Sequence, residues 1–141
     1  MRNIKNIILH CTAGGQFQKT VDIQNYWRKE LGWKNPGYHY IINADGTVEI
    51  LLSIDKISNG VAGFNSESIN ISYKGGVDGK GKAIDNRTPQ QIASQIKLIK
   101  ELRIKFPKAK IRGHRDFPNV TKACPSFDVK TWCKSVGIDP L

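Results

Sequence analysis

Three residues that lie far apart in this chain have side chains of the kind that bind zinc: His10, His114 and Cys124. Two imidazoles and one thiolate suit a borderline-soft ion such as zinc. Three protein ligands leave one coordination position open for water, and that open position distinguishes catalytic zinc sites from structural ones. Each residue taken alone is better explained as a buried histidine or thiol. The sequence around the three residues favours the zinc site.

Two further residues could complete the chemistry of such a site. Zinc activates a bound water and polarises a carbonyl group, but hydrolysis also requires stabilisation of the oxyanion and transfer of protons. Lys122 lies two residues before Cys124, so its ammonium could neutralise developing negative charge near the metal. Tyr38 could donate a hydrogen bond to the attacking water or to the oxyanion. The alternatives are a solvated lysine and a tyrosine at the edge of the core.

The remaining cysteines are predicted to pack in the core. Three cysteines without a CxxC pair argue against a disulfide framework and against a closed four-thiolate zinc site. Successive side chains of a strand point to opposite faces, so Cys11 faces the core if His10 faces the site. We therefore expect Cys11 and Cys133 to be packing residues and Cys124 to be the only thiol ligand.

Strand-like segments place the two histidines. His10 lies near the end of a buried apolar strand over residues 6–11, and His114 ends a second strand over 109–114. Residues 38–43 and 47–52 predict a hairpin, because Asn-Ala-Asp-Gly between them is typical of a turn. Residues 68–73 alternate isoleucine with polar residues, which predicts a strand with one solvated face or a strand at a crowded edge.

Helices are predicted between these strands. Residues 20–31 form an amphipathic pattern with Val21, Ile23, Trp27 and Leu31 as core positions. A second helix begins after Thr88, with Pro89 in its first turn and Gln91 completing a capping box, and it ends before Pro107. Ser126 or Asp128 caps a last short helix around Trp132. The order of elements predicts the α/β class, with helices packed on both faces of a mixed central sheet.

Composition limits the classes of protein to consider. A chain of 141 residues with 39% hydrophobic residues fits a single domain. No segment approaches the ~20 apolar residues of a membrane-spanning helix, and the N-terminus lacks the apolar core of a signal peptide. We expect a protein that is made in the cytoplasm, has no signal peptide and has no membrane partner.

The chain carries a net charge of +10, from 22 basic and 12 acidic residues. Residues 97–115 hold eight basic side chains and one glutamate, and such a field attracts polyanions, including anionic cell-wall polymers. The alternative is a solvated face that only aids solubility. Aromatic residues do not alternate with these charges and no recognition motif accompanies them, so direct binding of nucleic acid is the weakest interpretation.

Several motifs, spread in order along nearly the whole chain, resemble one family. The chain is similar to the zinc-dependent N-acetylmuramoyl-L-alanine amidases, whose fold is shared with peptidoglycan recognition proteins, and among them to the short amidase-type lysozymes of T-seven-like phages. The matching segments are LHCTA (9–13), GYHYIINADGTVE (37–49), GFNSESINI (63–71), GG (75–76), TPQQ (88–91), GHRD (113–116) and KACPSFD (122–128).

The resemblance implies a reaction and a set of site residues. It implies a single catalytic domain over residues 1–141 that hydrolyses the amide between N-acetylmuramic acid and L-alanine in peptidoglycan. One zinc ion per chain would be bound by His10, His114 and Cys124, with Tyr38 and Lys122 as the catalytic residues. Asn65 matches a family asparagine that positions substrate or a ligand, and His39 is expected to be structural.

One residue departs from the family pattern, and some alternatives stay open. Asn70 stands where the family usually has glycine, and it either alters the wall of the groove or occupies a polar edge position. The second interpretation of the chain is a peptidoglycan-binding module without catalysis, although members that only bind typically lack the thiol ligand. The resemblance implies a monomeric phage or prophage endolysin that acts on the wall after release, or an enzyme that recycles wall fragments inside the cell. The phage relatives also bind their own RNA polymerase, which adds a second partner to consider.

Overall fold

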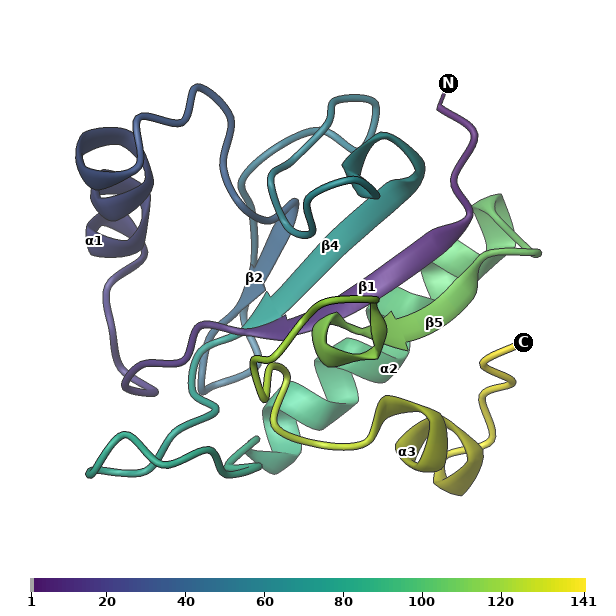
Figure 1. Cartoon of the computed structure of the whole chain (residues 1–141). Coiled ribbons are helices and arrows are strands. Elements are labelled where there is room, and N and C mark those ends of the chain that lie inside the picture. Colours follow the sequence, from purple (N-terminus) through teal and green to yellow (C-terminus); the bar gives the residue numbers. More distant parts are fainter. Residues whose placement is uncertain (1) are drawn as a thin grey trace.

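The computed structural model describes residues 2–141 and contains one five-stranded sheet in the order β3-β2-β4-β1-β5 (Figure 1). Strands β2, β4, β1 and β5 are parallel, and β3 pairs antiparallel with β2 through the predicted hairpin. The mixed sheet and the α/β class are therefore confirmed. The strands are β1 Asn6–Cys11, β2 Tyr40–Ile42, β3 Val48–Ile50, β4 Ser68–Tyr73 and β5 Lys110–Gly113.

The two faces of the sheet have different roles. On one face, Ile7 and Leu9 of β1 join the isoleucines of β4 in the main hydrophobic core, which the helix α2 (Pro89–Lys105) covers. On the other face, Ile8 belongs to a smaller cluster and His10 points toward the predicted site. This alternation follows from the two-residue period of a strand. It also places Cys11 in the core, and Cys133 of the C-terminal helix packs in the same core, both as predicted.

Helix α2 begins with the predicted capping box, in which the Thr88 side chain accepts from the Gln91 backbone N–H and the Gln91 side chain accepts from the Thr88 N–H. The buried face of α2 includes two polar residues, Gln91 and Gln95, which are both fully buried. Gln91 Nε2 donates to the backbone oxygens of Ile42 and Lys74, so both amide hydrogens of this buried side chain have an acceptor at the ends of β2 and β4.

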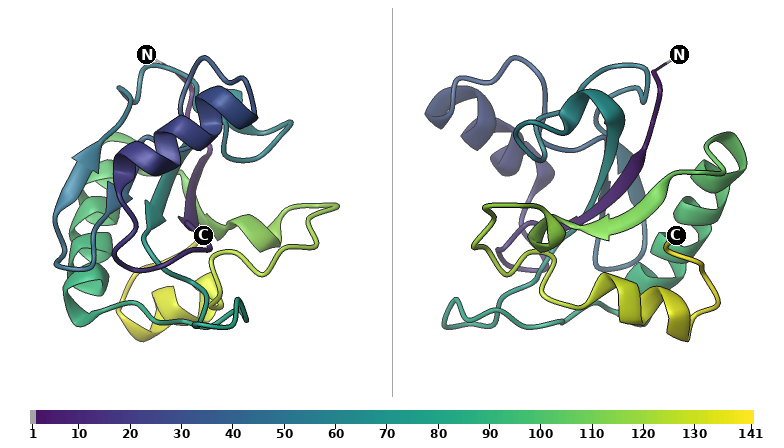
Figure 2. Two further views of the ribbon diagram at one scale, coloured as in Figure 1. Left: turned by 90° about the vertical axis from the view of Figure 1, so that its left-hand side faces the viewer. Right: turned by 45° about the vertical axis from the view of Figure 1, so that its right-hand side comes forward.

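The helix predicted over residues 20–31 forms, but it is not α-helical throughout. α1 (Thr20–Asn25) continues as a π-helical segment, η1 (Tyr26–Glu30), beside the sheet (Figure 2). Ile23 and Trp27 are buried as expected, whereas Val21 and Leu31 are 55% and 42% exposed, so their assignment to the core was wrong. Val21 lies nearly opposite Ile23 on the helix, and Leu31 lines the same open cavity as Trp27 instead of packing in the core.

Strand β4 also differs from its prediction. All six of its residues are buried, and it lies between β2 and β1 in the middle of the sheet. It has neither a solvated face nor an edge position, because the segment that precedes it covers its polar face: Ser58 and Asn70 are both fully buried and hydrogen-bonded to each other.

The last helix, α3 (Val129–Ser135), begins at Asp128, whose side chain accepts from the Thr131 N–H. Of the two residues that could have capped this helix, the structure thus uses Asp128. Ser126 instead donates to the backbone oxygen of Gly76. Among residues 2–141, no helix combines the length and the apolar character needed to cross a membrane.

Candidate metal centre

The sheet topology brings His10, His114 and Cys124 together. β1 and β5 are parallel neighbours, with Leu9 opposite Gly113. His10 follows Leu9 and His114 follows Gly113, so the two histidines lie at the same edge of the sheet. His114 begins the short helix η3 (His114–Asp116), and the chain then returns to place Cys124 beside His10. The ligand atoms of the three residues all lie within 4.8 Å of one another. The distance from His10 Nδ1 to Cys124 Sγ is 3.9 Å.

Backbone hydrogen bonds hold the thiol in place. The Cys11 N–H donates to Cys124 Sγ over 3.2 Å, and the Arg115 N–H donates to the Cys124 carbonyl oxygen over 2.8 Å. Gly76 packs directly on the Cys11 side chain with a φ of +94°, and a β-carbon there would overlap it. These contacts fix the Cys124 sulfur against the end of β1, a role of the Cys11 backbone that the sequence did not reveal.

The electrostatic environment keeps both imidazoles neutral. Burial, together with the proximity of His114 and Lys122, lowers the pKa of His10 to about 3. Burial and the Lys122 charge also lower the pKa of His114. Neutral imidazoles have a free lone pair, which is the form that binds metal. The hydrogen bond with Cys11 and burial raise the pKa of the Cys124 thiol, so a bound cation would have to displace its proton.

Tyr38 and Lys122 face the same cavity as the three candidate ligands. The cavity has a volume of about 490 Å³, within the range of ligand-binding clefts. The ring centroid of Tyr38 lies 5.1 Å from that of His10, and the Tyr38 hydroxyl donates to the Cys11 carbonyl oxygen over 3.3 Å. Burial raises the pKa of Tyr38, so the hydroxyl keeps its proton and acts as a donor. Lys122 is exposed at the rim, and its charge is felt by both histidines.

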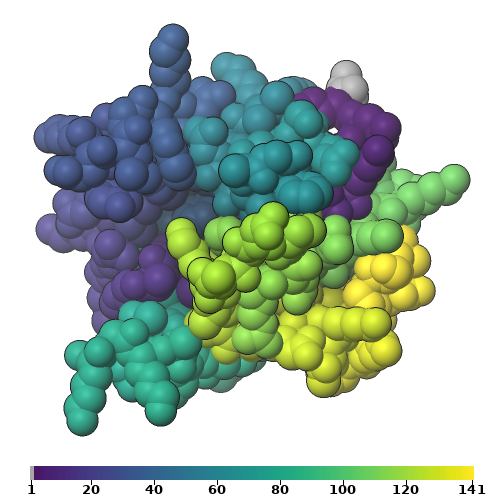
Figure 3. All heavy atoms as spheres, in the orientation of Figure 1, coloured from purple at the N-terminus to yellow at the C-terminus, as the bar shows by residue number. Residues whose placement is uncertain are grey.

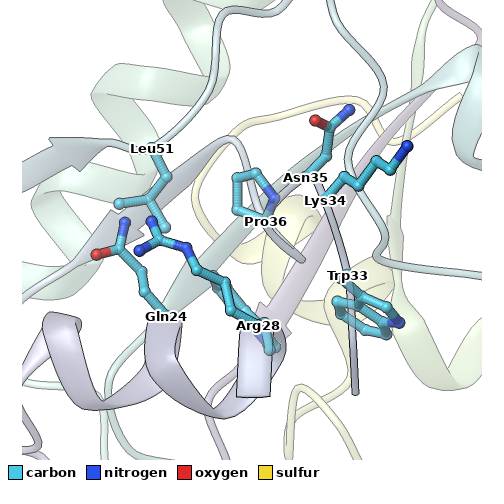
Figure 4. Close-up of a pocket in the computed structure, with 8 residues that line it drawn as sticks. Gln24, Arg28, Trp33, Lys34, Asn35, Pro36 and Leu51 are labelled. Carbon is cyan, nitrogen blue, oxygen red and sulfur yellow. The ribbon is translucent and has the colours of Figure 1, made fainter. Parts of the chain in front are cut away.

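Aromatic residues of the α1–η1 region form the opposite wall of this cavity. In Figure 3, the blue atoms of this region lie to the left of the yellow-green atoms of the loop that leads to Cys124. A separate cavity of about 50 Å³ lies behind this wall, near Arg28 and Pro36 (Figure 4). It is too small for a substrate. The aromatic wall consists of Tyr26, Trp27 and Trp33.

Asn65 is not brought together with the other predicted site residues. Its side-chain oxygen accepts hydrogen bonds from the backbone N–H groups of Gly60 and Val61, at 3.0 and 2.8 Å. Gly60 lines the cavity, whereas Asn65 does not. Direct contact of Asn65 with substrate stays a prediction, and the geometry gives the residue a role in holding the loop.

A buried hydrogen-bond network behind His10 was not predicted from the sequence. His10 Nε2 lies 2.8 Å from Asn70 Oδ1, and the Asn70 amide in turn contacts Ser58. His39 is fully buried next to these residues, and burial together with the charge of Arg2 lowers its pKa to about 4. The sequence signals for these contacts are the polar positions of residues 68–73, the asparagine at position 70 and the expected structural role of His39, but they do not predict a contact with His10.

Comparisons with known proteins bear on this geometry. A family model described as N-acetylmuramoyl-L-alanine amidase matches residues 1–127. The curated endolysin of Enterobacteria phage K11 is 45% identical over 128 residues, which cover 90% of this chain and 83% of that protein.

Solved structures show the same fold. The Ph2119 endolysin from the Thermus scotoductus MAT2119 bacteriophage Ph2119 is 28% identical with a TM-score of 0.79, covering 97% of this chain and 85% of that one. The N-acetylmuramoyl-L-alanine amidase LysC from Clostridium intestinale is 24% identical with a TM-score of 0.80, covering 98% and 88%.

Proposed function

This chain belongs to the N-acetylmuramoyl-L-alanine amidase family, and we propose that it performs the family's reaction with one zinc ion held by His10, His114 and Cys124. The enzyme is of the phage endolysin type and hydrolyses the amide bond between N-acetylmuramic acid and L-alanine in peptidoglycan. We further propose that residues 1–141 form a single catalytic domain that works as a monomer.

The convergence of three suitable ligands from separate segments carries the proposal. Bond lengths of about 2.1 Å to nitrogen and 2.3 Å to sulfur in a tetrahedral site imply ligand atoms about 3.5 Å apart. His10 Nδ1 and Cys124 Sγ are 3.9 Å apart, so a small movement would let both contact one ion. The low pKa values of the histidines support the same ion, because their lone pairs are free near neutral pH.

Residues of this chain would supply the catalytic functions that the metal does not. Zinc, when bound, activates water and polarises the scissile carbonyl group. Tyr38 keeps its proton and would donate a hydrogen bond to the oxyanion as charge develops there. Lys122, at the rim, would bring a positive charge to the same region. Asn65 would act through the Gly60–Val61 backbone, which it holds at the wall of the groove.

Metal removal separates an enzyme from a module that only binds peptidoglycan. We expect the purified protein to contain one zinc per chain and to reduce the turbidity of purified cell walls. A chelator should abolish the turbidity loss, and stoichiometric zinc should restore it. Wall binding without any loss of turbidity in the zinc-loaded protein would instead support the binding module.

The positive charge predicts a dependence on salt. If the basic surface concentrates the enzyme on an anionic wall, wall lysis should fall as salt rises, because ions screen exposed charges over ~10 Å at 0.1 M. Replacing Lys97, Lys100 and Lys108 with glutamine should weaken wall binding, which a wall-pelleting assay measures. Arg103 is left intact, since its side chain donates to the backbone oxygens of Ala109 and Asp139 and so supports the fold.

Hydrolysis of a small muramyl-peptide provides the control for this triple variant, and its rate should be less affected than wall lysis. Salt-independent wall binding together with unchanged affinity of the triple variant would show that the charge serves solubility alone.

A further inference from the structure

In the hydrogen-bond network behind His10, the donor and the acceptor of each hydrogen bond can be assigned. The assignment begins at His39, whose two ring nitrogens contact backbone groups. The Asn70 N–H donates to His39 Nδ1 over 3.0 Å, so Nδ1 of His39 carries no proton. The proton of this neutral imidazole is therefore on Nε2, which donates to the Lys56 carbonyl oxygen over 2.8 Å. A guanidinium nitrogen of Arg2 also lies 3.2 Å from Nε2, but with Nδ1 as the acceptor this contact is not a hydrogen bond, because both groups carry hydrogen. Two backbone groups thus fix the tautomer of His39.

The next link fixes the Ser58 hydroxyl. Ser58 Oγ lies 3.1 Å from the unprotonated His39 Nδ1, so the hydroxyl donates to that nitrogen and shares its lone pair with the Asn70 N–H. The Ser58 oxygen then accepts from Asn70 Nδ2 over 2.7 Å. Ser58, His39 and Asn70 are all fully buried, so water does not compete for these bonds.

The last link reaches the candidate metal ligand. With its amide nitrogen directed at Ser58, Asn70 presents Oδ1 to His10 Nε2 over 2.8 Å. A carboxamide oxygen can only accept, so Nε2 of His10 carries the proton. The lone pair of His10 is left on Nδ1, the nitrogen that lies 3.9 Å from Cys124 Sγ.

We propose that Asn70 is a positioning residue that holds His10 in the tautomer and orientation needed to bind the metal. The inference deepens the proposed function and rests on it. An acceptor behind a metal-bound histidine fixes the ring and raises its basicity, and losing such a partner typically costs ~10- to 100-fold in metal affinity. The site is built around this amide, since Gly60 packs on it so closely that a β-carbon at residue 60 would overlap it.

Zinc affinity in three variants tests the proposal. Asn70→Leu removes the acceptor at similar volume and should raise the dissociation constant for zinc ~10- to 100-fold, measured by competition with a chromogenic chelator. Asn70→Asp keeps an acceptor oxygen toward His10 and should bind zinc nearly as well as the wild type. Ile69→Val, on the opposite face of β4, controls for a slightly destabilised strand and should leave zinc affinity unchanged.

A second readout does not depend on zinc. In the metal-free wild type, nitrogen-15 NMR of the imidazoles should show His10 protonated on Nε2 and unprotonated on Nδ1. Ser58→Ala removes the acceptor of Asn70 Nδ2, so the Asn70 amide can rotate and exchange its oxygen and nitrogen. The proton of His10 should then redistribute between the two ring nitrogens. This measurement stands even if Asn70→Leu fails to fold.

Two results would overturn the proposal: wild-type zinc affinity in Asn70→Leu, or a His10 proton on Nδ1 in the metal-free wild type. Failure of the wild type to bind zinc at all would instead contradict the proposed function, while the NMR result would still report whether Asn70 sets the tautomer.

Discussion

Replacing Cys124 with serine is expected to remove bound zinc and nearly all activity on cell walls. A hydroxyl stays protonated near neutral pH and is a poor zinc ligand, whereas a thiolate is a good one. The loss of zinc affinity should exceed the ~10- to 100-fold that is typical when a supporting residue is removed. Zinc content by elemental analysis and turbidity loss on purified walls would measure the two effects.

Cys133→Ala is the matched control for this substitution. Cys133 is a fully buried thiol in the core cluster that α2 covers, so its loss should lower stability and leave zinc content unchanged. Full wall-lysing activity in a Cys124→Ser preparation that is demonstrably free of metal would contradict the proposed role of the thiol.

Tyr38→Phe and Lys122→Ala are expected to retain zinc and to lose activity, each by roughly 10²-fold or more if the residue stabilises the transition state. The candidate ligands are His10, His114 and Cys124, which both variants leave intact, so metal binding should survive. Phenylalanine preserves the ring that packs near His10 and removes only the hydroxyl. Steady-state rates on a soluble muramyl-peptide, with zinc content measured in parallel, would test both variants.

Two controls keep this result interpretable. Tyr40→Phe removes a hydroxyl from the first residue of β2, which packs against the main core. Lys130→Ala removes an exposed lysine that does not line the cavity. Both should have near wild-type rates. Wild-type rates in Tyr38→Phe and Lys122→Ala would show that the catalytic roles are assigned wrongly, and loss of zinc would point to a structural role.

Local sequence patterns predicted much of the fold because they reflect interactions between residues that are close in the sequence. The capping box at Thr88 and the hairpin turn follow from short-range hydrogen bonds and backbone preferences, and both form as predicted. The alternation of His10 and Cys11 across β1 likewise follows from the period of a strand. The side-chain chemistry of His10, His114 and Cys124 predicts the metal site, and the parallel pairing of β1 with β5 brings the two histidines to one edge of the sheet.

Features that depend on distant partners could not be read from the sequence. The polar residues of β4 are typical of an exposed face, but Ser58 and His39 from other segments cover Asn70 and satisfy its hydrogen bonds. The sequence pattern of Gln91 is that of a surface residue, and its burial depends on the backbone oxygens of Ile42 and Lys74, which accept from its amide. Leu31 is exposed because it lines the open cavity with Trp27, and the other walls of that cavity come from distant segments.

The chemical identity of the bond that is cut tests the central claim most directly. Purified peptidoglycan should be digested with the zinc-loaded enzyme and the products analysed by mass spectrometry and by labelling of new end groups. Hydrolysis at the proposed bond would release stem peptides with a free L-alanine amine and leave glycan strands with free muramic acid carboxylates. Products that retain the muramic acid–L-alanine bond, with new reducing sugar ends or new ends within the peptide, would contradict it.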